Sequence, residues 1–235
     1  MNELNFQYLK NNIKYLGFGE NLTEVLVKKL KEGLPDFSIT YRTAMNRKPF
    51  EAALHFRKPD SVDLYYLNSY SACLQRTNGE RLEQTFYLNN ARGVTAKEAY
   101  NLLEGRAVYK ELTNREGERY HAWLQLDFEK KDKRNNHEIR QFHENYGYDL
   151  RAAVSWFAIT ELGNPEKEKA LVLSLQKGNL QAVTIEKEGA IFKMFIEANP
   201  QFKTVTLYDA AMKRVKKEDI SSYHDVVRGS QMTNN

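Results

Sequence analysis

The 235-residue sequence predicts an α+β fold in which antiparallel β-meanders pack against helices. Three observations carry this expectation. Apolar residues recur with a helical period before residue 33, they alternate with a period of two from residue 37, and a capped helix at residues 95–104 introduces a second helical and alternating region. Two units are therefore expected, a helix–helix–meander unit over residues 1–92 and a helix–hairpin–helices–meander unit over residues 93–220. Residues 221–235 form a polar tail that we expect to be disordered.

Two amphipathic helices open the chain. The first carries an apolar stripe and ends at the G-F-G of residues 17–19. Asn21 and Glu24 have the spacing of a capping box at the start of the second helix, with Asn in place of Ser or Thr. Gly33, followed by Pro35, ends that helix. The stripe of the first helix consists of Phe6, Leu9, Ile13 and Leu16.

Four strands are expected next. Residues 37–45 and 50–57 alternate between apolar and polar side chains, and the N-R-K-P between them predicts a turn. Val62, Leu64 and Tyr66 predict a third strand. Residues 82–88 predict a fourth, after T-N-G-E.

The stretch T-A-K-E-A-Y-N-L-L-E-G, residues 95–105, has the features of a well-capped helix. Thr95 is the expected N-cap and Glu98 completes a capping box, while Gly105 offers the left-handed residue that ends the helix. An alternating strand follows at residues 120–128, after a turn at N-R-E-G-E. Each conspicuous residue here has a structural task, which favours a structural over a catalytic role for this stretch.

The second half of the chain repeats the pattern of helices followed by strands. After a charged loop at residues 130–136, N-H-E-I-R-Q-F-H-E-N predicts a short helix. G-Y-D-L opens another helix, and the next begins with Asn164 as cap and Pro165 at its first position, ending at Gly178. Three strands joined by turns at K-E-G and A-N-P are expected after it.

Composition indicates an ordered, soluble, cytoplasmic protein. Hydrophobic residues make up 41% and charged residues 28% of the chain, which is ordinary for a globular protein. The longest apolar run, residues 152–159, is far shorter than the roughly 20 residues of a spanning helix, so no membrane contact is expected. The first residues lack the pattern of a secretory signal. Cys73 is alone, so no internal disulfide can form, as befits a reducing compartment.

Five segments together are similar to a known family. They are Y-L-G-F-G, T-A-K-E-A-Y-N-L-L-E-G-R-A-V, Y-H-A-W-L-Q-L-D-F, N-Y-G-Y-D-L and E-A-N-P-Q-F-K-T-V-T-L-Y-D. In this order they resemble a family of proteins of unknown function carried on conjugative transposons of Bacteroides-type gut bacteria, over roughly residues 6–215. The resemblance implies a bacterial, cytoplasmic protein encoded near DNA-transfer and DNA-processing genes. It brings no catalytic residues with it.

The residue pattern does not predict an enzyme, a metal site or a cofactor. His137 and His143 fall in the expected helix, where a separation of six residues turns them about 600° apart, unlike the four-residue spacing of zinc-binding helices. Cys73 has no identifiable base beside it, and the glycines at 17–19 match no nucleotide-binding pattern. No nucleophile, base and orienting group can be assembled. We therefore expect a non-enzymatic binding or accessory protein with no catalytic residue, metal or cofactor.

Positive charge is concentrated between residues 28 and 58, which hold eight basic residues against three acidic ones. Strand alternation places the polar side chains of residues 42–58 away from the helices, beside one tyrosine. Cations and rings on an open sheet suit sequence-nonspecific contact with DNA or RNA through phosphate neutralisation and base stacking. The candidate nucleic-acid-binding residues are Arg42, Arg47, Lys48, His55, Arg57, Lys58 and Tyr65.

Two other interpretations remain open. The basic strands can be an ordinary solvated sheet face, in which Arg and Lys stems cover apolar surface. Alternatively, the protein is a protein–protein interaction scaffold in conjugative transfer or its regulation, with other mobile-element proteins as partners. Trp123, Tyr109 and His121 could form an aromatic patch for such a partner, although we expect the helices at 149–178 to cover it. The sequence leaves the oligomeric state open.

Overall fold

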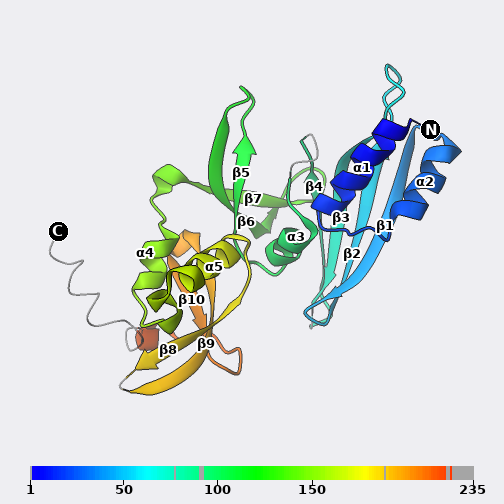
Figure 1. The fold of residues 1–235 in the computed structure, drawn as a ribbon. Helices are drawn as coiled ribbons and strands as arrows, with labels where there is room; N and C mark the ends of the chain where they lie inside the picture. The colour runs from blue at the N-terminus through cyan, green and yellow to red at the C-terminus, as the bar shows by residue number, and fades with distance from the viewer. Residues whose placement is uncertain (1, 77, 90–92, 188, 221–222, 224–235) are drawn as a thin grey trace. The chain divides into compact units, whose positions relative to one another are not determined.

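The computed structural model describes residues 2–76, 78–89, 93–187, 189–220 and 223. Within these residues the chain folds as an α+β protein with three antiparallel sheets and accompanying helices, which confirms the predicted fold class (Figure 1). The predicted tail, residues 221–235, lies outside the described residues except for Tyr223. None of the described helices is long and apolar enough to cross a membrane.

Contacts between residues divide the chain into two compact units. The first comprises residues 1–104 and 128–138, and the second comprises residues 105–127 and 139–235. The sequence analysis placed the boundary near residue 92. The helix after that boundary instead joins the first unit, as does the segment 128–138, because side chains of both contact the first sheet.

The first unit is a four-stranded meander covered by helices. Its strands lie in the order β1-β2-β3-β4, with every neighbouring pair antiparallel. Helices α1 and α2 cover one face of this sheet in Figure 1. The elements are α1 (Glu3–Tyr15), α2 (Thr23–Glu32), β1 (Asp36–Met45), β2 (Lys48–Arg57), β3 (Tyr66–Gln75), β4 (Arg81–Tyr87) and α3 (Ala96–Leu103).

Local sequence signals define most ends of these elements. Gly33 is left-handed at the end of α2, as predicted. The turn between β1 and β2 is formed by Asn46 and Arg47, which are both left-handed, as a two-residue hairpin turn requires. The capping box predicted for α2 is wrong: the N-cap is Leu22, and no side chain caps that helix.

The third strand begins later than predicted. The backbone amide of Tyr65 donates to the side-chain oxygen of Asn5 at 2.8 Å, and the Asn5 amide donates to the Tyr65 carbonyl at 2.9 Å. The Asn5 side chain, on α1, thus forms with the Tyr65 backbone the two hydrogen bonds that a neighbouring strand would otherwise form. Strand pairing starts only at Tyr66, so Val62 and Leu64 lie in a connection.

Helix α3 has the capping box that the sequence predicts. The Glu98 carboxylate accepts from the Thr95 amide at 2.8 Å, and the Thr95 hydroxyl accepts from the Glu98 amide at 3.4 Å. Gly105 follows the helix with φ +89°, in the left-handed region. Two orphan amides at the start of the helix are therefore satisfied by its own first turn.

The second unit contains one of the other two sheets and most of the remaining one. Strands β5-β6-β7 form one sheet, whose segment 128–138 belongs to the first unit, and β10-β9-β8 form the other. Asn164 and Pro165 begin α5, and Gly178 follows it in a left-handed conformation, all as predicted. The elements are β5 (Val108–Thr113), β6 (Arg119–Lys131), β7 (His137–His143), α4 (Leu150–Ser155), α5 (Pro165–Gln176), β8 (Gln181–Lys187), β9 (Ala190–Asn199), β10 (Thr204–Tyr208) and α6 (Lys217–Ile220), with 3₁₀ turns at Glu144–Tyr146, Thr160–Gly163 and Pro200–Phe202.

The helix predicted for residues 136–145 is instead strand β7 over His137–His143, followed by a 3₁₀ turn from Glu144. A tight turn precedes it, in which the Asp132 carboxylate accepts from the amides of Arg134 and Asn136. The backbone amide of His137 donates to the Gln84 side-chain oxygen at 2.8 Å. Gln84 thus provides a hydrogen bond that a neighbouring strand would otherwise provide. Pairing with β6 and this anchor outweigh the weak local helical pattern.

Trp123 belongs to the core of the second unit. It is only 4% exposed and packs in one apolar cluster with residues of α4 and α5 such as Leu150, Val154 and Val172. The expectation that the helices at 149–178 cover the aromatic side chain of β6 is thus confirmed for Trp123.

Candidate binding face on the first sheet

The first sheet has an inner face that packs on helices and an outer face opposite them. Inner residues contact the helices and the loops beside them. The ring centroid of Tyr70 lies 5.0 Å from that of Phe18, and the centroid of Phe50 lies 6.4 Å from that of Tyr100 on α3. Strand alternation puts the other set of side chains on the outer face. These are Asp36, Ser38, Thr40, Arg42 and Ala44 on β1, Pro49, Glu51, Ala53, His55 and Arg57 on β2, Tyr66, Ser69, Ser71, Cys73 and Gln75 on β3, and Arg81, Glu83, Thr85 and Tyr87 on β4.

A row of hydrogen-bonded side chains crosses this face. The Ser38 hydroxyl lies 2.9 Å from His55 Nδ1, and His55 Nε2 lies 3.0 Å from the Ser71 hydroxyl. The Ser71 hydroxyl in turn lies 2.9 Å from that of Thr85. The row therefore takes one side chain from each of the four strands. We call Ser38, His55, Ser71 and Thr85 the polar row.

His55 is held as a hydrogen-bonding centre. Burial lowers the pKa of its imidazole below the ordinary value of 6.5, which favours the neutral ring at pH 7. One ring nitrogen of a neutral imidazole donates and the other accepts, and the hydroxyls of Ser38 and Ser71 can serve either role. Ser38 occupies the position at Nδ1 where a catalytic triad has a carboxylate. This geometry suits structural hydrogen bonding better than base catalysis.

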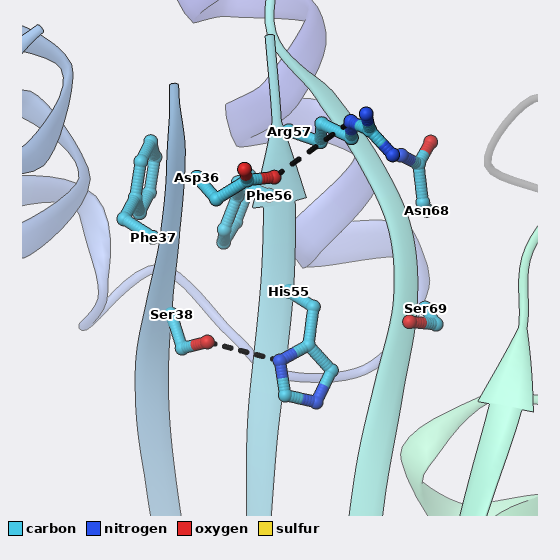
Figure 2. Close-up of a pocket in the computed structure, with 8 residues that line it drawn as sticks. All are labelled: Asp36, Phe37, Ser38, His55, Phe56, Arg57, Asn68 and Ser69. Carbon is cyan, nitrogen blue, oxygen red and sulfur yellow. Dashed lines mark hydrogen bonds and ion pairs between the residues drawn. The ribbon is translucent and has the colours of Figure 1, made fainter. Parts of the chain in front are cut away.

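A shallow pocket of about 420 Å³ lies at one end of the polar row, between β1, β2 and β3 (Figure 2). Figure 2 shows the Arg57 side chain between Asp36 and Asn68 at one side, with His55 reaching toward Ser38 below it. Arg57 Nε lies 3.9 Å from the Asp36 carboxylate. The pocket thus offers a cation, a carboxylate, an imidazole and small polar groups to a ligand. Its lining is Asp36, Phe37, Ser38, His55, Phe56, Arg57, Asn68 and Ser69.

The formal charges of the outer face cancel, because three arginines lie among three carboxylates. Arg42 pairs with Glu51 directly across the strands at 3.1 Å. Arg57 lies beside Asp36 as described above, and Arg81 lies by the Cys73 thiol. Burial raises the pKa of that thiol, and the positive charge of Arg81 partly opposes this rise. The remaining carboxylate is Glu83, opposite Cys73. The outer face is therefore mixed in charge and not continuously positive.

The structure separates the residues that the sequence proposed for nucleic acid. Arg42, His55 and Arg57 lie on the outer face, and Arg47 lies exposed in the hairpin turn. Lys48 does not join them. It shares the parity of Phe50, faces inward, and places Nζ 2.7 and 2.9 Å from the two carboxylate oxygens of Glu104 at the end of α3.

Tyr65 and Lys58 also depart from the expected surface. Tyr65 is only 6% exposed, and its hydroxyl donates to the Leu34 carbonyl at 2.8 Å. Lys58 pairs with Asp63 at 3.2 Å and lies over the ring of Tyr65. Strand alternation does not apply to Tyr65, because this residue precedes β3 and its backbone is hydrogen-bonded to Asn5.

Two exposed tyrosines of the outer face were missed. Tyr66 pairs with Arg57 across the strands, and Tyr87 pairs with Ser69. The guanidinium of Arg134 donates to the Tyr87 hydroxyl at 2.7 Å and lies 5.5 Å from the ring centroid. Correct strand limits would have found Tyr66. No local signal places Arg134, since it comes from the turn before β7.

The two histidines considered for metal binding lie at opposite ends of β7. His137 is buried and His143 is exposed, and six residues of strand separate them by roughly 20 Å. Among the described residues, no group of three or more His, Cys, Asp or Glu side chains is arranged to hold a metal ion.

Comparison with protein-family models, with curated proteins and with solved structures gave no match.

Proposed function

We propose that the protein is a non-enzymatic binding protein and that the outer face of the β1–β4 sheet contacts a protein partner. The polar row carries this proposal. Its four side chains already satisfy one another across the sheet, so covering them with a partner leaves few polar groups without hydrogen bonds. The small residues between them, such as Ala53 and Ser69, keep the surface flat.

Charge favours a protein over a polyanion as the main partner. Three arginines balanced by three carboxylates give little long-range attraction to a phosphate backbone. A mixed face instead selects a partner surface with the complementary arrangement of charges. Arg42–Glu51 and Arg57–Asp36 mark the two ends of this arrangement along β1 and β2.

The size of the face indicates a modest affinity. Three strands of ten residues and one of seven, spaced about 4.8 Å apart, span at most roughly 15 by 33 Å, or about 500 Å² on this side. A standard stable interface buries about 800 Å² on each side. The expected complex is therefore transient unless the partner also covers the edge of β1. The resemblance to conjugative-transposon proteins makes other proteins of such an element the first partners to examine.

Site-specific photocrosslinking tests this proposal with a matched pair of exposed tyrosines. Tyr66 lies on the outer face and is 37% exposed, whereas Tyr8 lies on α1 and is 41% exposed. Each is replaced by p-benzoylphenylalanine in cells that carry such an element. We expect one dominant protein adduct at position 66 and not at position 8. The adducted protein, once purified, should bind the wild-type chain in calorimetry.

Ala53→Arg supplies the second arm, because it raises a large charged side chain in the middle of the flat face. It should abolish both the adduct and the measured binding while leaving the circular dichroism spectrum unchanged. Equal adducts at positions 66 and 8, or binding unaffected by Ala53→Arg, would refute the proposal.

Contact with single-stranded DNA or RNA is the second candidate, favoured by the exposed tyrosines. Tyr66 lies beside Arg57, and Tyr87 lies beneath Arg134, so a ring for base stacking adjoins a cation for phosphate at two places. Such binding would be sequence-nonspecific and would weaken steeply with salt.

A gel shift with single-stranded oligonucleotides at several salt concentrations tests this second candidate. Replacing Arg57 and Arg134 together by Ser should lower the magnitude of the log–log salt slope by roughly one to two. Lys28→Met is the control, because Lys28 is exposed on α2, which covers the opposite face of the sheet, and should leave the slope unchanged. No shift by the wild-type protein at low salt would eliminate nucleic acid.

A further inference from the structure

The second unit contains a pocket with aromatic walls, separate from the outer face of the first sheet. Its volume is about 350 Å³, at the lower end for small-ligand sites and suited to one side chain or a small molecule. Tyr109 comes from β5, Trp123 from β6 and Tyr148 from the segment before α4. The lining is Tyr109, Trp123, Phe142, His143, Glu144, Tyr148, Asp149, Leu150, Arg151, Val172 and Gln176.

The rings of the pocket are held in place by one another. Trp123 lies 5.3 Å from Tyr109 and 5.3 Å from Tyr148, measured between ring centroids. Tyr109 stacks on His121 at 5.4 Å. The Tyr148 hydroxyl donates to the Thr204 carbonyl at 2.8 Å, which fixes that ring. A ligand would therefore meet a preorganised aromatic wall.

Carboxylates give this aromatic wall a negative rim. Glu144 lies close enough to Tyr109 that its charge and hydrogen bond add to burial in raising the pKa of the Tyr109 phenol. Asp149 lines the pocket while accepting from the amide of Ala152 at 3.1 Å. The lining contains one arginine, Arg151. Its guanidinium forms an ion pair at 3.0 Å with Glu168, which does not line the pocket.

We propose that this pocket binds an organic cation, a guanidinium or alkylammonium group presented on an Arg or Lys side chain of a partner peptide. The faces of Trp and Tyr rings attract cations, and carboxylates at the rim add charged hydrogen bonds. An anion would meet Glu144 and Asp149, and a neutral apolar group would leave both carboxylates without a role in recognition. Charge complementarity therefore selects the cation.

Trp123 serves as the reporter of binding. The chain has two tryptophans, and the second, Trp156, is not among the lining residues. In a Trp156→Phe background, fluorescence comes from Trp123 alone. The probes are short peptides, Gly-Arg-Gly and Gly-Lys-Gly with blocked ends, and the control is the citrulline peptide, which has the shape of the Arg peptide without its charge.

We expect saturable quenching by the cationic peptides at low salt, with millimolar dissociation constants for so small a ligand, and at least about tenfold weaker binding of the citrulline peptide. Methylguanidine, titrated separately, distinguishes the sources of the cation. Weaker binding than the peptide supports a peptide partner, whereas equal affinity would overturn that part of the proposal in favour of a free small cation.

Two isosteric variants test the rim. Glu144→Gln and Asp149→Asn should each weaken the Arg peptide about three- to tenfold, since a charged hydrogen bond becomes a neutral one. Asn still caps α4, so the second variant keeps the fold. Glu166→Gln, an exposed residue of α5 outside the lining, is the control and should change nothing. Equal affinity for the citrulline peptide, no response to both rim variants, or no saturable quenching by the cationic peptides would overturn the proposal.

Discussion

Replacing Lys48 by Met should destabilise the first unit, although the sequence analysis names Lys48 only as a candidate nucleic-acid-binding residue. The Lys48 ammonium lies within 2.9 Å of both Glu104 oxygens, and the two side chains are 23% and 13% exposed. Glu104 is the C-cap of α3, where the helix dipole disfavours a negative charge. The ammonium therefore offsets two costs of the Glu104 negative charge, its partial burial and its unfavourable interaction with the helix dipole.

The expected loss lies between two measured classes of ion pair. Exposed pairs contribute up to about 1 kcal/mol, and breaking a fully buried pair costs about 3–5 kcal/mol. For a pair that is mostly but not fully covered, we expect about 2 kcal/mol for Lys48→Met. Removing Glu104 as well, by Glu104→Gln, should restore about half, so the magnitude of the coupling in the double-mutant cycle is about 1 kcal/mol plus the cost of Glu104→Gln alone.

Hydrogen exchange read by mass spectrometry is the suitable assay. Both tryptophans, Trp123 and Trp156, belong to the second unit, so their fluorescence does not report on the first unit directly. Amides of β1 and β2 that open with the unit should exchange about 30-fold faster in Lys48→Met, which corresponds to the 2 kcal/mol above.

Arg42→Met is the matched control, because Arg42 is on the same hairpin and its ion pair with Glu51 is largely exposed. It should change exchange by less than about threefold. If Lys48→Met accelerates exchange no more than Arg42→Met, the pairing of Lys48 with Glu104 does not stabilise the unit and the reasoning fails.

Four further predictions rest on single residues. Thr95→Ala should lower the free energy of unfolding by about 1 kcal/mol through loss of the N-cap, and Gly105→Val by more, because φ is +89° there; hydrogen exchange across α3 checks both. Burial lowers the pKa of His55, so the unfolded chain takes up a proton at higher pH than the folded one. Stability contributed by His55 is present above pH 6.5 and is lost as pH falls through the folded pKa, and His55→Gln should flatten this decline in urea titrations. Burial raises the pKa of the Cys73 thiol, so iodoacetamide should modify it more slowly at pH 7 than a free cysteine and faster as pH rises; a rate equal to that of free cysteine would contradict this.

The sequence by itself determined the parts of the fold that local chemistry controls. Helix α3 follows from Thr95, Glu98 and Gly105, since caps act within one turn of the chain. The inward set of β2 follows from the alternation of Phe50 to Phe56, because successive side chains of a strand point to opposite faces. These signals need no knowledge of distant residues.

Tertiary structure decided the features that depend on a distant partner. β7 is a strand because β6 and Gln84 supply hydrogen bonds that no local pattern reveals. Tyr65 is buried because Asn5, sixty positions earlier, holds its backbone.

The candidate site shows the same division. Alternation placed Arg42, His55 and Arg57 on one face, but the charges opposite them, the polar row and the inward pairing of Lys48 arise only when four strands and α3 come together. Whether a basic residue is exposed or paired depends on which carboxylate the fold brings beside it. The local run of basic residues therefore did not predict the electrostatics of the assembled sheet.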